Sequence, residues 1–479
     1  MTANGTSPAP PERPTRVRYG ILALVCLLAM ITYMDRAMYG SAKADLMAAV
    51  NRPVSDFFYV LVAFQLAYAL FEIPTGWLGD TFGPRTTLLR IVLWWSLFVA
   101  LTGFAGWGVP GAETLAIGFG VLVAMQFLFG IGEAGAFPNM SKAIYNWFPE
   151  DKRAFAKGAV WMSARFMGGL TPCLWVLIVE IGGYSWRQAL WLFAGLAVVW
   201  CAAWYVWFRN NPGEHRAANE AERALVRAGK GSKGGHAGVP WKLIYSNPSV
   251  WALCLMYMAT NFNWYFLMYY LPGKLKGEFA GGGPAGPGRW VLDTFGGDGA
   301  KVIIALIGGA PLLIGMLGCY LGGVLSDWHF RVTGDRKWAR RTTAMIGYGM
   351  AGVCYLAAAG CVGGNLLLFA GTLILVGFFN DLMMAPAWAT SQDIGRGYSA
   401  IVGGTMNMVG NLGATLGNLV TGLILKYCDG ASGNLGYQYC FVMYACVYAA
   451  GVGLWLLIDP TRPVGDSDQV VAGTSADEV

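Results

Sequence analysis

The sequence predicts an all-α polytopic membrane protein with twelve transmembrane helices in two six-helix bundles. Three observations predict this class. Of the 479 residues, 56% are hydrophobic and 13% are charged, and the mean hydropathy is +0.48, whereas soluble domains carry about 25% charged residues. Apolar segments of about 20 residues, the length that crosses a bilayer, recur along the chain. A polar, basic stretch divides these segments into two sets of six.

The expected organisation has five parts. Residues 1–17 are a disordered N-terminal tail, 18–209 the N-terminal six-helix bundle, 210–248 a cytoplasmic linker, 249–458 the C-terminal six-helix bundle, and 459–479 a C-terminal tail. The individual spans are expected at about 18–40, 57–79, 88–107, 115–140, 158–182 and 188–209, then 249–272, 301–325, 343–362, 365–390, 399–426 and 436–458.

The placement of charged residues and cysteines predicts the orientation in the membrane and argues against nucleic-acid, metal and cofactor binding. Lys and Arg concentrate in loops on the side of both termini and the linker, so we expect cytoplasmic termini in the cell (inner) membrane. The net charge of +6 follows this pattern and does not indicate nucleic-acid binding. The ten cysteines lie in or beside apolar segments without a C-x-x-C spacing, which predicts no metal and no cofactor. We expect a monomer in the lipid bilayer.

The first apolar segment contains adjacent charges, in Tyr33-Met34-Asp35-Arg36. Charge at membrane depth costs a few kcal/mol, so such residues usually face a cavity and serve a function. An internal ion pair that locks two helices is the alternative. Gln126 and Glu133 share one stripe of the fourth span, and Arg165 lies on the fifth. Arg36 and Arg165 could hold a carboxylate from two helices.

Two alternatives stay open for these charges. Arg165 could instead pair with Glu133 or Glu180, and Glu133 could be a structural partner of a cytoplasmic-side arginine. Glu72, just before Pro74, is interpreted as structural or gating.

The second half offers mainly neutral polar groups. Asn261 and Tyr265 lie four residues apart on the seventh span, and Asn407 and Asn411 have the same spacing on the eleventh. Amides and phenols suit a hydroxyl-bearing substrate. The alternatives are an interfacial aromatic belt and interhelical hydrogen bonds. Asp381, polar at mid-span, is a further candidate for proton or cation coupling.

Two loops carry a repeated pattern. Gly76-Trp77-Leu78-Gly79-Asp80 is followed by Gly83 and Arg85, and Gly323-Val324-Leu325-Ser326-Asp327 stands at the corresponding place in the second half. Gly76 and Gly83 allow close helix approach, and Asp80 with Arg85 could form a gating latch. The first loop resembles the signature of the major facilitator superfamily, which has the two-bundle fold predicted above.

Further segments narrow the resemblance. Tyr33-Met34-Asp35-Arg36, the stretch from Phe129 to Pro138, and the stretch from Trp147 to Arg153 resemble the anion:cation symporter family, with its hexuronate, galactonate and glucarate permeases and sialin-like carriers. The resemblance implies that Asp35 and Glu133 couple protons, and that Arg36 binds substrate with Tyr33 and Tyr68. Many members carry an arginine where this chain has Gln126, and a glutamine where it has Arg165. The cationic charge has moved to the neighbouring helix.

The predicted function is secondary active transport: proton-coupled symport of an organic anion, such as a hexuronate or aldonate, by alternating access. Once the acids lose their protons inside, Arg36 is expected to pair with Asp35 again. The alternatives are an organic-anion exchanger or a sodium-coupled carrier, and then a polytopic membrane enzyme, for which the sequence offers no acid, His or metal cluster. The expected substrate-binding residues are Tyr33, Arg36, Tyr68, Gln126, Arg165, Asn261, Tyr265, Asn407 and Asn411.

Overall fold

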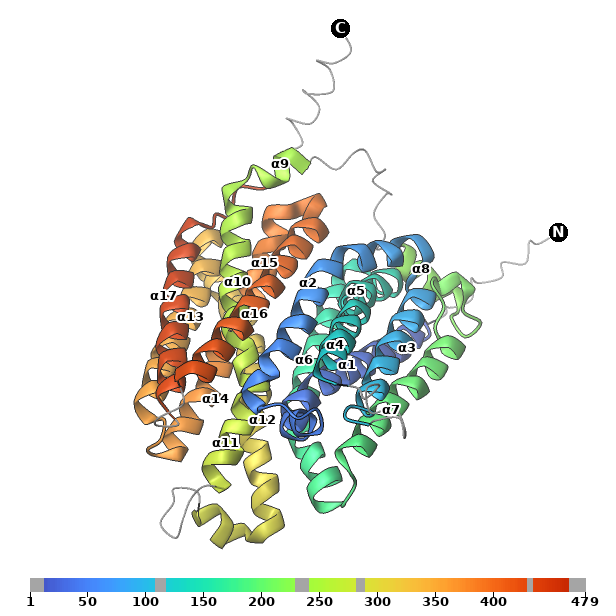
Figure 1. Cartoon of the computed structure of the whole chain (residues 1–479). Helices are drawn as coiled ribbons and strands as arrows, with labels where there is room; N and C mark the ends of the chain where they lie inside the picture. The colour runs from blue at the N-terminus through green and yellow to red at the C-terminus, as the bar shows by residue number, and fades with distance from the viewer. Residues whose placement is uncertain (1–12, 108–117, 229–240, 281–288, 429–433, 465–479) are drawn as a thin grey trace, which may run out of the picture.

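The computed structural model describes residues 13–107, 118–228, 241–280, 289–428 and 434–464, which form helices and no strands. Two helical bundles stand side by side, the first on the right of Figure 1 and the second on the left. We call the face with α8, α9 and the start of α1 the linker side, and the opposite face, with α11, the distal side (Figure 1).

The helices follow the predicted order. The first bundle contains α1 (Val17–Ala49), α2 (Phe57–Phe82), α3 (Pro84–Thr102), α4 (Phe119–Glu133), α5 (Ala136–Trp147), α6 (Glu150–Trp175) with a π-helical end (Val176–Ile181), and α7 (Trp186–Trp207). The linker contains α8 (Glu220–Ala228) and α9 (Trp241–Tyr245). The second bundle contains α10 (Pro248–Tyr269), α11 (Leu271–Ala280), α12 (Arg289–Thr333), α13 (Arg336–Cys361), α14 (Leu366–Leu382), α15 (Met384–Gly395), α16 (Ser399–Cys428) and α17 (Leu435–Leu457).

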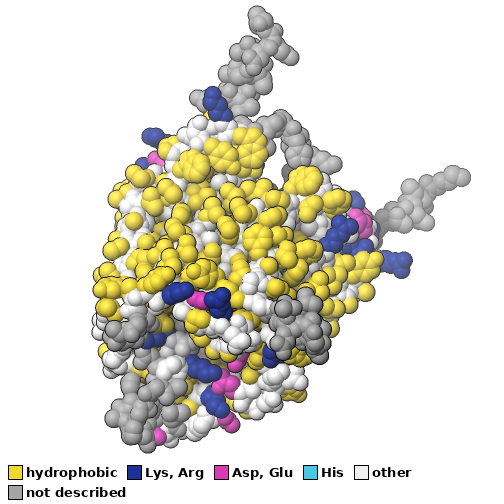
Figure 2. Space-filling view, in the orientation of Figure 1, with side chains coloured by type: hydrophobic (Ala, Val, Ile, Leu, Met, Phe, Trp, Pro, Cys, Tyr) yellow, Lys and Arg dark blue, Asp and Glu magenta, His cyan; other side chains and the backbone are white. Residues whose placement is uncertain are grey.

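Eleven spans in the described ranges are long and apolar enough to cross a membrane. The twelfth predicted span corresponds to α10, which is 22 residues long and mostly buried, and which carries Asn261, Asn263 and Trp264 among its apolar residues. Its position between other helices, and not against lipid, accounts for this polarity. Figure 2 shows hydrophobic side chains covering most of the visible face, with charged groups toward its two ends. The predicted all-α, twelve-span membrane fold is confirmed.

Two predicted spans are interrupted in the structure. The span expected at 115–140 divides into α4 and α5, and the span expected at 365–390 divides into α14 and α15. Pro138 and Pro386 explain both breaks, because proline cannot donate the helical hydrogen bond to the residue four positions earlier. A buried acid lies at each break: Glu133 is the last residue of α4, and Asp381 is the last but one of α14.

The linker is fixed to the first helix. The buried carboxylate of Glu222 on α8 accepts hydrogen bonds from the backbone N–H groups of Val17 (3.3 Å) and Arg18 (3.1 Å) and from the hydroxyl of Thr15. The first N–H groups of a helix lack partners within it, and negative charge there is favourable. Within the expected disordered tail, residues 1–12 lie outside the described residues, whereas Thr15 is held by α8.

Candidate functional site

A cavity lies between the two bundles near the middle of their helices. The space free of protein atoms is about 480 Å³ when the part open to solvent is included, and the volume that can hold the centre of a water molecule is about 30 Å³ in this conformation. Eight of the nine predicted substrate-binding residues line it, and Gln126 does not: this side chain is buried on α4 beside Tyr39. The lining residues are Tyr33, Arg36, Tyr68, Phe137, Trp161, Arg165, Tyr257, Thr260, Asn261, Trp264, Tyr265, Asn380, Met384, Asn407 and Asn411.

Arg36 of α1 is one of two arginines of the first bundle that line this cavity. Its Nε donates to Oε1 of Glu133 at 2.5 Å, and its Nη1 donates to the hydroxyl of Tyr265 at 3.4 Å. The guanidinium carbon lies 4.7 Å from the ring centre of Tyr68. Nη2 is buried and has no hydrogen-bond partner among the described residues. Arg36 therefore keeps a donor for an anion in the cavity.

Asp35 faces away from its neighbour in sequence. Successive residues of a helix point about 100° apart, and Asp35 does not line the cavity. It is 1% exposed, and neither carboxylate oxygen has a hydrogen-bond partner in the described part of the chain. The expected pairing of Arg36 with Asp35 is not what this structure contains, since Glu133 holds Arg36 instead.

Arg165 connects the bundles. Its Nη2 donates to Oδ1 of Asp381 at 3.2 Å, and its Nε makes an ion-pair contact of 3.0 Å with Oδ2. Nη1 donates to the hydroxyl of Tyr33 at 3.2 Å, and the guanidinium stacks 3.9 Å from the ring centre of Trp264. Neither partner considered from the sequence is correct: Glu133 holds Arg36, and Glu180 pairs with Lys276 at 2.6 Å.

Glu72 forms a second link between the bundles at this depth. Its carboxylate on α2 accepts hydrogen bonds from the amides of Asn407 and Asn411 on α16, the latter at 3.2 Å. Both asparagines also line the cavity. Their amides therefore hold an acid of the opposite bundle in this conformation, and a substrate would have to compete with Glu72 for them.

Contacts on the distal side seal the space between the bundles. Lys426 of α16 lies 2.7 Å from Asp56, beside α2, and the Lys276–Glu180 pair joins α11 to the end of α6. Gly169 of α6 and Gly309 of α12 bring two backbones together so closely that a Cβ on Gly309 would overlap the Gly169 carbonyl. On the linker side, the nearest cross-bundle ring contact is Trp161 with Trp388, at 6.4 Å between centres.

The predicted gating residues lie at the linker side. Gly83 has φ +77° at the junction of α2 and α3, a conformation that favours glycine. Gly76 lies against Pro138 of α5. Arg85 donates to the Tyr205 carbonyl at 2.8 Å. The side chain of Asp80 lies outside the described residues, so the Asp80–Arg85 latch stays a prediction.

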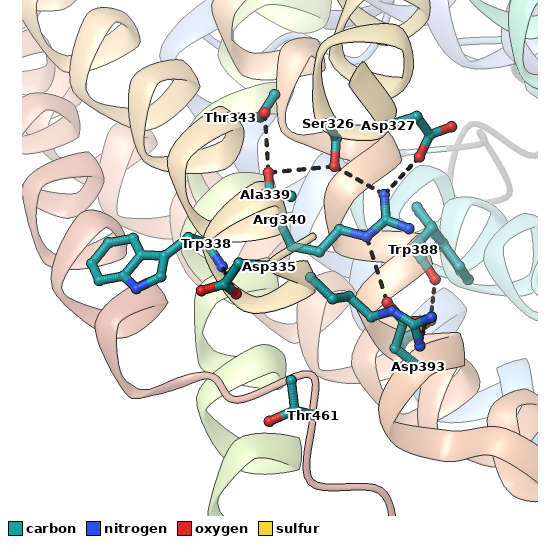
Figure 3. A network of polar contacts seen from close by, with 12 residues as sticks. Ser326, Asp327, Asp335, Trp338, Ala339, Arg340, Thr343, Trp388, Asp393 and Thr461 are labelled. Carbon is teal, nitrogen blue, oxygen red and sulfur yellow. Dashed lines mark hydrogen bonds and ion pairs between the residues drawn. The ribbon is translucent and has the colours of Figure 1, made fainter. Parts of the chain in front are cut away.

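The repeated motif of the second half has a clearer structure (Figure 3). Arg340 of α13 donates to the hydroxyl of Ser326 at 2.9 Å and pairs with Asp327 at 3.1 Å and Asp393 at 3.5 Å. The motif lies within the last turns of α12, and its charges tie α12, α13 and α15 together.

Several lining residues were absent from the predicted set. Tyr257 and Trp264 belong to the same stripe of α10 as Asn261 and Tyr265, so extending the helical period by one turn would have found Tyr257. Asn380 precedes Asp381, the residue that the sequence singles out as polar at mid-span, and lines the cavity near the end of α14. Trp161 lies four residues before Arg165, on the same stripe of the fifth predicted span, and follows from the same helical period. Phe137, Thr260 and Met384 carry no pattern that separates them from ordinary core residues.

Residues 25–418 match the family model described as Major Facilitator Superfamily. The chain belongs to this superfamily. The chain is 28% identical over 456 residues to the probable sulfoacetate transporter SauU of Cupriavidus necator, covering 95% of this chain and 96% of the relative. It is 25% identical to the probable galactarate/D-glucarate transporter GudP of Escherichia coli K12, covering 90% and 91%. It is 26% identical to the D-galactonate transporter of Escherichia coli O6:H1, covering 97% and 99%.

Solved structures agree on the fold of this superfamily member. The D-xylose–proton symporter has a TM-score of 0.67 at 14% identity, covering 93% of this chain and 98% of that one. A bacterial homolog of the lysosomal transporter Spinster, inward-facing and occupied, has a TM-score of 0.66 at 17% identity with the same coverage. The expected anion:cation symporter type is confirmed by the relatives. The protein is a multi-pass membrane transporter and not an enzyme.

Proposed function

We propose that this transporter is a proton-coupled symporter that imports a small organic anion by alternating access. The observation that carries the proposal is Arg36, whose guanidinium lines the cavity, has one unpartnered donor, and is neutralised by Glu133 in the absence of substrate. A substrate carboxylate or sulfonate can take the place of Glu133 on this guanidinium.

Competition for Arg36 supplies the coupling. A buried charge without a partner is costly, so an anion on Arg36 requires Glu133 to become neutral by taking up a proton. Asp35 lacks a cationic partner among the described residues, and burying it is cheaper in the protonated form. It is the second proton-coupling group. Return of Glu133 to Arg36 after deprotonation expels the anion.

Alternating access is supported by contacts that differ along the interface between the bundles. The distal side is closed by ion pairs and by the Gly169–Gly309 contact, while Trp161 and Trp388, toward the linker side, lie 6.4 Å apart between ring centres. We assign the linker side to the cytoplasm of the inner membrane, with both termini there, on a monomeric carrier. Each proton that moves inward across 100 mV contributes about 2.3 kcal/mol to accumulation.

The substrate class is inferred from the lining. Tyr68, Tyr257, Tyr265, Thr260 and Asn261 can donate or accept hydrogen bonds around the two arginines. This composition suits a short polyhydroxy acid or a small sulfonate. The names of the relatives, which mention galactonate, galactarate/glucarate and sulfoacetate, agree with that class.

Transport by purified protein in liposomes tests the proposal. With an inward proton gradient, we expect accumulation of galactonate, galactarate or sulfoacetate that a protonophore abolishes. Arg36→Ala should remove binding of all three anions. Accumulation driven by sodium, or exchange without net uptake at any proton gradient, would replace the proton scheme by one of the alternatives.

A further inference from the structure

Arg165 and Asp381 form a second arginine–acid pair at the same cavity. Nη2 of Arg165 donates to Asp381 and Nη1 donates to Tyr33, while Nε makes an ion-pair contact with Oδ2 of Asp381. Arg165 is 6% exposed and Asp381 is completely buried. Unlike the Arg36–Glu133 pair, which lies within the first bundle, this pair joins the two bundles. A monoanion bound to Arg36 leaves the Arg165–Asp381 pair intact.

We propose that Arg165 binds the second acidic group of a dianionic substrate, so that the transporter selects dicarboxylates or sulfonate–carboxylates over monoanions. The proposal rests on the symport function above and names the substrate class of the same site. The second acidic group takes the place of Asp381 on Arg165, as the first one takes the place of Glu133 on Arg36.

The geometry allows one small molecule to reach both arginines. Tyr33 lies between them, with its ring centre 5.5 Å from the guanidinium carbon of Arg36 and 5.6 Å from that of Arg165. The two guanidinium carbons therefore lie no further apart than these two distances together. Acidic groups separated by one to four carbons can span this gap while each keeps a charge-assisted hydrogen bond.

Asp381 keeps a hydrogen-bond donor after Arg165 releases it. The amide of Asn380 donates to Oδ1 of Asp381 at 3.0 Å, and the hydroxyl of Tyr448 fixes Asn380 by donating to its Oδ1 at 2.7 Å. A dianion adds two negative charges to the cavity, which the displaced Glu133 and Asp381 balance by taking up one proton each. Loading also removes the ion pair between the bundles at mid-depth.

Two matched pairs of anions test the proposal: galactarate against galactonate, and sulfoacetate against 2-hydroxyethanesulfonate. In each pair a carboxylate is replaced by a hydroxymethyl group. Binding is measured by competition in proteoliposome counterflow. We expect the wild type to prefer the dianion by about tenfold or more, since a hydrogen bond between charged groups is worth more than a neutral one.

Three variants distinguish a role of the Arg165–Asp381 pair in substrate selection from a purely structural role. Arg165→Gln should reduce the preference to near unity with a small change in monoanion affinity, and Asp381→Asn should keep or raise dianion affinity because the competing acid is gone. Lys276→Gln breaks another pair between the bundles, with Glu180, and should leave the preference unchanged. Equal loss of dianion and monoanion in both Arg165→Gln and Asp381→Asn would make the pair purely structural and overturn the proposal.

The result also separates this inference from the proposed function. If the wild type binds the dianion and the monoanion of each pair with equal affinity, dianion selection is overturned, but anion symport is not. If the wild type neither binds nor transports any of the four anions, the proposed function fails and the inference fails with it.

Discussion

The Nε atom of Arg36 lies 2.5 Å from Glu133, while Asp35, adjacent to Arg36 in sequence, has no hydrogen-bond partner among the described residues. The two acids of the first bundle therefore have different environments. Glu133 competes with substrate for a cation, whereas Asp35 is buried without one. Substitution of each acid by its amide should distinguish these roles.

Glu133→Gln removes the counter-charge of Arg36 and retains the shape of the side chain. We expect lower thermal stability without ligand, because breaking a buried pair costs about 3–5 kcal/mol, and a larger stabilisation by substrate anion than in the wild type. Substrate affinity should lose most of its dependence on pH. Thermal unfolding in detergent, with and without anion, measures both effects. A pH dependence equal to that of the wild type would remove Glu133 from the coupling role.

Asp35→Asn should leave the fold nearly unchanged, because no ion pair of Asp35 is lost in the described chain. We expect an unfolding temperature within a few degrees of the wild type, loss of proton-driven accumulation, and retained counterflow exchange. Uptake assays in liposomes with and without a proton gradient separate the two modes. Uphill uptake at the wild-type level would show that Asp35 carries no coupled proton.

Gly309→Ala should block closure of the distal side, since the added methyl group overlaps the Gly169 carbonyl across the bundle contact. We expect uptake to fall by about tenfold or more, because overpacking of this kind costs about 1–3 kcal/mol. Labelling of a cysteine introduced at Lys276 reports distal opening.

Gly308→Ala is the matched control: its methyl group would lie 3.4 Å from the nearest atom, in Pro272, and should be tolerated. Equal uptake by the two variants would contradict the closure role.

His215 in the linker should make stability depend on pH. Burial and the nearby charge of Arg209 lower the pKa of His215, and a backbone contact with Trp207 and the charge of Glu222 offset this only in part. Its Nδ1 accepts from the N–H of Ala217 at 3.2 Å, which requires the neutral ring. The unfolded chain then binds more protons than the folded one below about pH 6.5, so this contribution to stability falls as pH decreases through that value.

Thermal unfolding between pH 8 and 5 measures this effect. His215→Asn provides an acceptor that does not titrate, and its unfolding temperature should decline less on acidification. Parallel declines in the wild type and the variant would assign the pH dependence to other groups.

Periodicity and hydropathy predicted the spans and most of the cavity, because both depend on which face of a helix a residue occupies. Tyr265 and Asn261 on α10 and Asn407 and Asn411 on α16 follow from spacing alone. Spacing and hydropathy did not predict where each helix begins and ends. The span expected at 301–325 lies within α12, Arg289–Thr333, whose backbone is non-helical at Gly296 (φ +71°), so the helix after this kink begins near the predicted start and continues past the predicted end to Thr333.

The sequence did not predict which polar side chains pair with one another across the structure. Arg165 and Asp381 are distant in the chain, as are Glu72 and Asn407, and a helical period predicts a face but not the group opposite. Sequence adjacency favoured Asp35 as the partner of Arg36, although neighbours on a helix diverge. The breaks after Glu133 and Asp381 could have been inferred from Pro138 and Pro386.

Those two breaks interrupt equivalent helices, yet their acids connect different parts of the molecule. A change at Glu133 alters the inside of one bundle, whereas a change at Asp381 alters the adhesion of one bundle to the other. Both acids compete with the cargo for an arginine, but Asp381 also holds one bundle against the other. A substitution at Glu133 therefore changes affinity without changing that adhesion, whereas a substitution at Asp381 changes affinity and the rate of reorientation together, so an engineer retuning this carrier for a new acid would begin at Glu133.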